Sequence, residues 1–86
     1  MNKLEQEIIN TIAEEGEIDK SDITLDSNLY DLGIDSLSSL EILVALENKY
    51  DIRITQNRLK DVNNAREIIR VVSSEVKKKQ RKHHLA

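Results

Sequence analysis

Hydrophobic residues recur at helical spacing in three parts of the chain. In residues 4–13 they are separated by Glu and Asn, as in an amphipathic helix, and the pattern stops near Gly16. Residues 36–50 contain no helix breaker and are dense in Leu, Ile, Val, Ala and Glu, with Asp35 as the expected N-cap. Asn64 is expected to cap a last helix, with Glu67 at its third position as in a capping box. Its expected buried stripe is Ala65, Ile68, Ile69, Val72 and Val76.

The segments between these helices predict one short helix and otherwise irregular structure. Residues 17–35 mix Asp, Ser, Thr and Asn with single apolar residues, which indicates a long loop held by apolar anchors; loops of this length are often functional. Ile52 and Ile54 alternate as in a strand, but no second strand candidate exists, so a connector is predicted. Residues 56–60 are expected to form one helical turn. The sequence therefore predicts an all-α bundle of three longer helices and one short helix, with a long loop between the first and second.

The composition is that of one small domain with an aliphatic core. The chain has 86 residues, of which 38% are hydrophobic and only 2% aromatic, with no Trp or Phe, so Leu, Ile and Val must fill the core. Without Cys, neither a disulfide nor a thiolate metal site can form. No segment approaches the roughly 20 apolar residues of a membrane span. We therefore expect a soluble, cytoplasmic monomer.

Charge is distributed unevenly along the chain. All 16 acidic residues lie within residues 1–76, where eight basic residues leave a formal charge of −8. Such a body repels nucleic acid and favours partners with basic surfaces. The remaining five basic residues crowd into the end of the chain. We expect residues 1–76 to form the folded domain and residues 77–86 to be a basic, disordered, solvated tail.

The available side chains argue against an enzyme or a calcium site. The only histidines, His83 and His84, lie in the tail, so a serine nucleophile of the body would lack a base nearby in sequence. The motif Gly-x-Ser-x-Gly of serine hydrolases is also absent. An EF-hand that begins at Asp26 has Asp31 at its sixth position, where Gly is required. One that begins at Asp31 has Ile42 at its twelfth, where Glu is required. We predict no catalytic residues and no metal ligands.

The sequence Asp-Leu-Gly-Ile-Asp-Ser-Leu at residues 31–37 places the hydroxyl of Ser36 at the first turn of the predicted second helix, soon after Gly33. A phosphodiester on this serine would face unpaired backbone N–H groups and the positive end of the helix dipole, a gain of about 0.3 to 1 kcal/mol in an exposed setting. On the residues alone two interpretations stay open: a serine suited to modification, or a simple helix cap formed by Asp35 and Ser36.

Together with this motif, further residues resemble those of a known family: Glu41, Ala45-Leu46-Glu47 and Tyr50-Asp51-Ile52. Over residues 4–76 the chain is similar to the acyl carrier proteins of fatty-acid and type II polyketide synthesis. The resemblance implies that a phosphopantetheinyl transferase attaches 4′-phosphopantetheine to Ser36, that Asp35 supports recognition by this transferase, and that acyl groups travel as thioesters. It also implies that the second helix docks onto acyl-loading, condensing and acyl-processing enzymes with basic patches.

One side of the predicted second helix combines apolar and acidic residues, which are Leu37, Leu40, Glu41, Val44 and Glu47. Towards the other side lie Ile42, Leu43, Leu46 and Tyr50, where a core would be. Apolar residues ringed by acids on an outer face suggest a partner site. On the residues alone, burial of Leu37, Leu40 and Val44 in the core is an equally open interpretation.

The chain departs from the family in charge. The end of the second helix and the third helix are usually acidic there, whereas here they carry Asn48, Lys49, Arg53, Gln56, Asn57, Arg58 and Lys60. Altered surface charge discriminates among partners, which favours a carrier dedicated to one acyl group or pathway over the housekeeping fatty-acid role. Two alternatives stay open: a peptidyl or aminoacyl carrier that uses the same serine, and an unmodified helical adaptor that only binds proteins.

Overall fold

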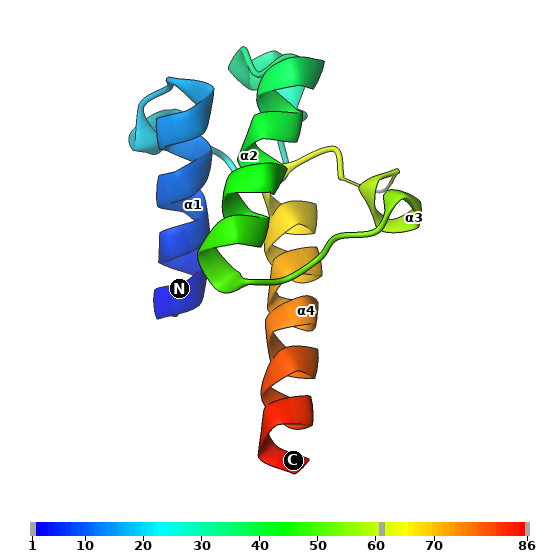
Figure 1. The fold of residues 1–86 in the computed structure, drawn as a ribbon. Helices are drawn as coiled ribbons and strands as arrows, with labels where there is room; N and C mark the ends of the chain where they lie inside the picture. Colours follow the sequence, from blue (N-terminus) through cyan, green and yellow to red (C-terminus); the bar gives the residue numbers. More distant parts are fainter. Residues whose placement is uncertain (1, 61, 86) are drawn as a thin grey trace.

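The part of the chain that the structure describes contains three long α-helices and one short α-helix (Figure 1). The computed structural model describes residues 2–60 and 62–85, with the backbone alone for residues 81–85. The helices are α1 (Lys3–Gly16), α2 (Ser36–Tyr50), α3 (Gln56–Leu59) and α4 (Ala65–Leu85). Helices α1, α2 and α4 pack against one another, while α3 lies to one side. The predicted all-α class and the order of the helices are confirmed.

Two short 3₁₀ helices interrupt the long segment between α1 and α2. They are η1 (Lys20–Asp22) and η2 (Leu29–Leu32). Between α2 and α3, residues 51–55 form an irregular connector. This agrees with the prediction from Ile52 and Ile54, whose strand-like alternation has no partner strand. In the part of the chain that the structure describes, no helix is long and apolar enough to cross a membrane.

Each long helix begins at a side chain that accepts a backbone N–H. Asp35 and Asn64 accept the N–H three residues further on, at 2.8 and 2.9 Å, which confirms both predicted N-caps. Helix α1 has a full capping box that the sequence analysis missed, in which Asn2 accepts the Glu5 N–H at 2.8 Å and its own N–H donates back to the Glu5 carboxylate at 3.2 Å. Asparagine thus takes the place of the usual serine or threonine.

The core is aliphatic, as the composition predicts. It gathers one face of α1, α2 and α4 together with single residues from the loops. Leu29 and Ile34 are the buried anchors of the long loop, and Ile54 is that of the connector. In α4 the expected stripe is buried except for the half-buried Val76. The buried residues are Ile8, Ile9, Ile12, Leu29, Ile34, Ile42, Leu43, Leu46, Ile54, Ala65, Ile68, Ile69, Val71 and Val72.

A hydrogen bond ties the end of α2 to α1. The Tyr50 hydroxyl donates to a carboxylate oxygen of Glu7 at 2.8 Å. Burial, together with the hydrogen bond to Glu7, raises the pKa of Tyr50 to about 12. Since the raised pKa favours the neutral phenol in the folded state, the contribution to stability is complete below the ordinary value of 10.0 and is lost as the pH rises through about 12.

The structure differs from the expected disordered tail, because α4 continues through residues 77–85. Lys, Gln and Arg are good helix formers, no Gly or Pro stops the helix, and positive charge is favourable at a helix C-terminus. The Lys79 ammonium also reaches the Asp51 carboxylate at 2.6 Å and lowers the pKa of Asp51. The end of α4 extends past the ends of α1 and α2 (Figure 1). The basic side chains expected at residues 81–84 lie outside the described residues.

The division into a domain of residues 1–76 and a separate tail stays a prediction. A chain that ends at Val76 should keep α1, α2 and the packed part of α4, since Lys77, Lys78, Lys79 and Gln80 are exposed. It loses the exposed Lys79–Asp51 pair, and such pairs contribute about 0 to 1 kcal/mol. The melting temperature, followed by circular dichroism, should therefore fall by no more than roughly 4 to 8 °C.

Lys79→Ala in the full-length chain is the matched control, because it removes the same pair and leaves the helix in place. A collapse of helicity in the truncated chain, with Lys79→Ala close to wild type, would show that residues 77–86 belong to the folded domain.

Candidate functional site

Ser36 is the exposed first residue of α2, and the turn that precedes it is held in place by hydrogen bonds and by burial. Helix η2 precedes Ser36 and is capped by Gly33, whose φ of 86° lies in the left-handed region that residues with a side chain rarely adopt. The Gly33 N–H donates to the Tyr30 carbonyl at 3.0 Å, and the Ile34 N–H donates to the Leu29 carbonyl at 2.9 Å. Because Leu29 and Ile34 are both buried, this turn is fixed to the core and carries Ser36 at the surface.

The long loop is also bonded to the start of α4. The Leu29 N–H donates to the Asn63 carbonyl at 2.9 Å, and the Arg66 N–H donates to the Leu25 carbonyl at 3.1 Å. The Arg66 guanidinium lies 2.7 Å from the Asp26 carboxylate, and this hydrogen bond holds the pKa of Asp26 below its ordinary value. Arg66 and Asp26 are 40 residues apart in the sequence. Local spacing does not pair residues so far apart, so these polar contacts could not be predicted, whereas the apolar anchors of the loop could.

Asp35, the predicted recognition residue, lies next to Ser36 and caps the helix. Its carboxylate accepts the Ser38 N–H at 2.8 Å, and hydrogen bonds from Ser38, the backbone one foremost, lower the pKa of Asp35. Asp35 is exposed and therefore presents a negative charge at neutral pH. The expectation that a phosphodiester on Ser36 would face unpaired N–H groups is wrong for Ser38, whose N–H is already used.

Tyr30 is a neighbour of Ser36 that the helical spacing and the motif at residues 31–37 do not indicate. Its hydroxyl lies within hydrogen-bond distance of the Ser36 hydroxyl, and either group can be the donor. Both side chains are exposed, Tyr30 by 66%. The signal in the sequence was a single aromatic residue in a polar loop, six positions before the serine.

The outer side of α2 is open to solvent. Leu37, Leu40 and Val44 are 65%, 51% and 46% exposed, and Glu41 beside them is exposed too. Ile42, Leu43 and Leu46 fill the core from the opposite side. These exposures decide between the two interpretations of the helix, because the three apolar residues of the outer side are not core.

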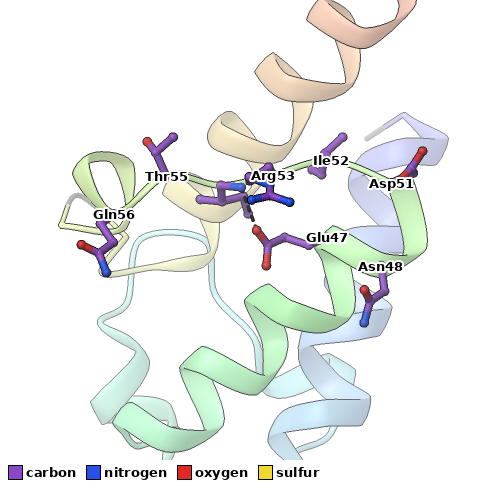
Figure 2. A pocket seen from close by; sticks show the side chains of 8 residues that line it. Glu47, Asn48, Asp51, Ile52, Arg53, Thr55 and Gln56 are labelled. Atoms are coloured by element: carbon purple, nitrogen blue, oxygen red, sulfur yellow. Dashed lines mark hydrogen bonds between the residues drawn. The ribbon is translucent and has the colours of Figure 1, made fainter.

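Glu47 differs from the rest of the predicted docking set. It is half-buried, and its carboxylate accepts the Ile54 N–H at 2.8 Å, so the side chain turns towards the connector (Figure 2). It borders an open hollow of about 600 Å³ between the end of α2 and α3. The side chains around this hollow are mostly polar: Glu47, Asn48, Asp51, Ile52, Arg53, Ile54, Thr55 and Gln56. Glu47 thus has a structural role that its helical position did not indicate.

A covalent group on Ser36 is compatible with this geometry. The hydroxyl is exposed at the start of a 15-residue helix, where negative charge is favourable, and a group linked there needs no enclosing cavity. Ser38 and Ser39, the other hydroxyls of the same turn, are half-buried. The site therefore distinguishes one serine from its neighbours. Among the described residues, no group of three or more His, Cys, Asp or Glu side chains could hold a metal ion.

Comparisons with known proteins agree with this geometry. The family model described as "Phosphopantetheine attachment site" matches residues 6–72. An acyl carrier protein of Guillardia theta is 32% identical over 79 residues, which cover 88% of this chain and 98% of the relative. An acyl carrier protein of Rickettsia massiliae is 35% identical over 72 residues, covering 83% of this chain and 84% of the relative.

Replacement of Glu47 should test its structural role. Glu47→Ala leaves the part-buried Ile54 N–H without its charged acceptor, which should lower the free energy of unfolding by about 1 to 3 kcal/mol in urea denaturation. Glu47→Gln keeps an acceptor and should lose less. The matched control is Glu41→Ala on the same helix, which should stay within about 0.5 kcal/mol of wild type. Equal stabilities for the two alanine variants would contradict this role.

Proposed function

The chain belongs to the acyl carrier protein family and carries a covalent 4′-phosphopantetheine, and we propose that Ser36 is the residue to which this group is attached. Members of the family are carriers rather than enzymes, and they interact with acyl-processing enzymes. The observation that supports Ser36 best is its exposed hydroxyl at the first position of α2, directly after the anionic Asp35.

The chain's own residues supply position and recognition. The attached group brings a thiol that can hold acyl cargo as a thioester. The burial of Ile34 and the cap formed by Asp35 hold the start of α2 in place, so that a transferase meets Ser36 in one defined conformation. Bonds from Ser38 lower the pKa of Asp35, and the negative charge of this exposed carboxylate suits recognition by a transferase with a basic surface.

We further propose that the outer side of α2 is the docking face for partner enzymes. Of the described residues, the large apolar side chains that are exposed are Tyr30, Leu37, Leu40 and Val44. They lie on η2, which precedes Ser36, and on the outer side of α2, which begins at Ser36. An apolar centre with Glu41 and Asp35 at its edge fits acyl-loading, condensing and processing enzymes that present apolar pockets rimmed by Lys or Arg. Glu47 contributes less than the sequence indicates, because its carboxylate is engaged by the connector.

The pathway is proposed from surface charge. Lys49, Arg53 and Lys60 are exposed near the end of α2 and α3, where the resemblance leads one to expect acids, whereas Arg58 is engaged by Glu75 at 2.7 Å. Exposed basic residues repel the basic patches of general fatty-acid enzymes. This supports a carrier dedicated to one acyl group in a fatty-acid or polyketide pathway. The names of the relatives favour acyl over peptidyl cargo, and the family model favours a modified protein over an unmodified adaptor.

Incubation with coenzyme A and a phosphopantetheinyl transferase should add one phosphopantetheine unit per chain, as measured by intact mass. Ser36→Ala should abolish the gain because the accepting hydroxyl is lost. Ser39→Ala is the matched control on the same turn and should be modified like wild type. A folded Ser36→Ala variant that is still modified, or a wild type that several transferases leave unmodified, would contradict the proposal.

Charge reversal at Glu41 should slow association with partner enzymes. In Glu41→Lys the loss should lie mainly in the association rate and shrink as salt rises, because rim charges steer encounters over a Debye length of about 8 Å at physiological ionic strength. The transferase is a suitable first partner, measured by stopped flow or surface plasmon resonance. Glu15→Lys, an exposed charge reversal on α1, is the control with the same change in net charge. Equal association rates in the two variants would argue against the docking face.

A further inference from the structure

We infer that Tyr30 is a second point of contact for the phosphopantetheine arm: its hydroxyl donates a hydrogen bond to the phosphodiester on Ser36. The inference rests on the proposed attachment at Ser36 and goes beyond it, because it assigns a binding role to a residue outside α2. It predicts that the first bonds of the arm are oriented by the carrier itself before any enzyme engages it.

The backbone of Tyr30 is fixed although its side chain is exposed. The Tyr30 N–H donates to the Asn28 side chain at 2.9 Å, and its carbonyl accepts the Gly33 N–H at 3.0 Å. Leu29, directly before it, is buried in the core. The phenol therefore projects from a rigid turn, and its contact with Ser36 joins two elements that are each held in place.

The two tyrosines of the chain have different surroundings. Tyr50 is half-buried, and its hydroxyl joins α2 to α1 through Glu7. Tyr30 is 66% exposed, and its hydroxyl meets an exposed serine. A hydrogen bond between two solvent-exposed hydroxyls adds little to folding, because water can replace either partner. Packing therefore does not explain the placement of Tyr30, whereas contact with the modified residue does.

No cation lies near Ser36 in the sequence to pair with a phosphodiester anion. Residues 21–48 contain no Lys or Arg, so the segment that surrounds the serine in sequence supplies no cation. Asp35 adds a negative charge and occupies the Ser38 N–H. Arg66, which the fold brings to the loop, is paired with Asp26. The Tyr30 hydroxyl is the neutral donor that already touches the atom to be modified.

Modification would also fix the direction of this hydrogen bond. Before it, either the Tyr30 or the Ser36 hydroxyl can donate. In the transfer a bond forms between the Ser36 oxygen and the phosphorus of coenzyme A that bears pantetheine, the pyrophosphate bond breaks, adenosine 3′,5′-bisphosphate leaves, and the serine proton passes to a base of the transferase. The ester oxygen and the charged phosphate oxygens can then only accept, so the phenol must donate. Hydrogen bonds to charged acceptors are the stronger kind, so the contact should tighten on modification.

The decisive experiment compares Tyr30→Phe with Tyr50→Phe in the modified protein by ³¹P nuclear magnetic resonance. Both variants lose one phenolic hydroxyl, but only Tyr30→Phe removes the donor beside Ser36. We expect a changed ³¹P chemical shift and a narrower line in Tyr30→Phe, because the phosphodiester moves more freely, and wild-type values in Tyr50→Phe. Values for Tyr30→Phe that match wild type would overturn the inference.

A second measurement uses the wild-type chain and needs no variant. With ¹³Cζ-labelled tyrosine, the Tyr30 resonance should shift when the protein is modified, while that of Tyr50 should not. Two unmoved resonances would overturn the inference even though Ser36 carries the arm. Failure of the wild type to take up phosphopantetheine is a different result, because it contradicts the proposed attachment site itself.

Discussion

The burial of Leu29 and Ile34 is the constraint on which the display of Ser36 depends. Burying one such side chain contributes roughly 1.5 to 3 kcal/mol, which offsets part of the conformational entropy that the loop loses on folding. Between the two anchors the chain has only η2 and Gly33 in which to turn, and the turn closes through backbone hydrogen bonds. Asp35 and Ser36 follow directly, so the modified residue sits at a fixed helix start and needs no cavity of its own.

Helix α2 has to serve the core and the surface at once. Its inner side is held by aliphatic packing and by the bond between Tyr50 and Glu7, which leaves Leu37, Leu40 and Val44 free to meet partners. Leaving three large apolar side chains in water has a cost in solubility that a protein bears when the surface has a function. The acidic residues around them keep that surface soluble and give it a charge that basic partners can recognise.

The sequence predicts best what is local and periodic. The helices, the caps at Asp35 and Asn64 and the connector around Ile54 follow from spacing and capping rules, and all are present. The contacts of Tyr30 with Ser36 and of Glu47 with Ile54 depend on turns that bring residues together, which periodicity does not describe. The end of α4 departs from the prediction for another reason. Its apolar stripe stops at Val76, but the residues that follow still have a high helix propensity, so the helix continues. Burial sets the boundary of a core, not the boundary of a helix.

The proposed role of Ser36 is to present acyl groups on a phosphopantetheine arm. Intact-mass analysis of the protein isolated from its native cells, followed by fragmentation of the peptide that contains Ser36, tests it most directly. We expect phosphopantetheine on Ser36 and, on part of the population, an additional acyl mass that hydroxylamine removes, as expected of a thioester. A chain recovered wholly unmodified, or an arm located on another residue, would contradict it.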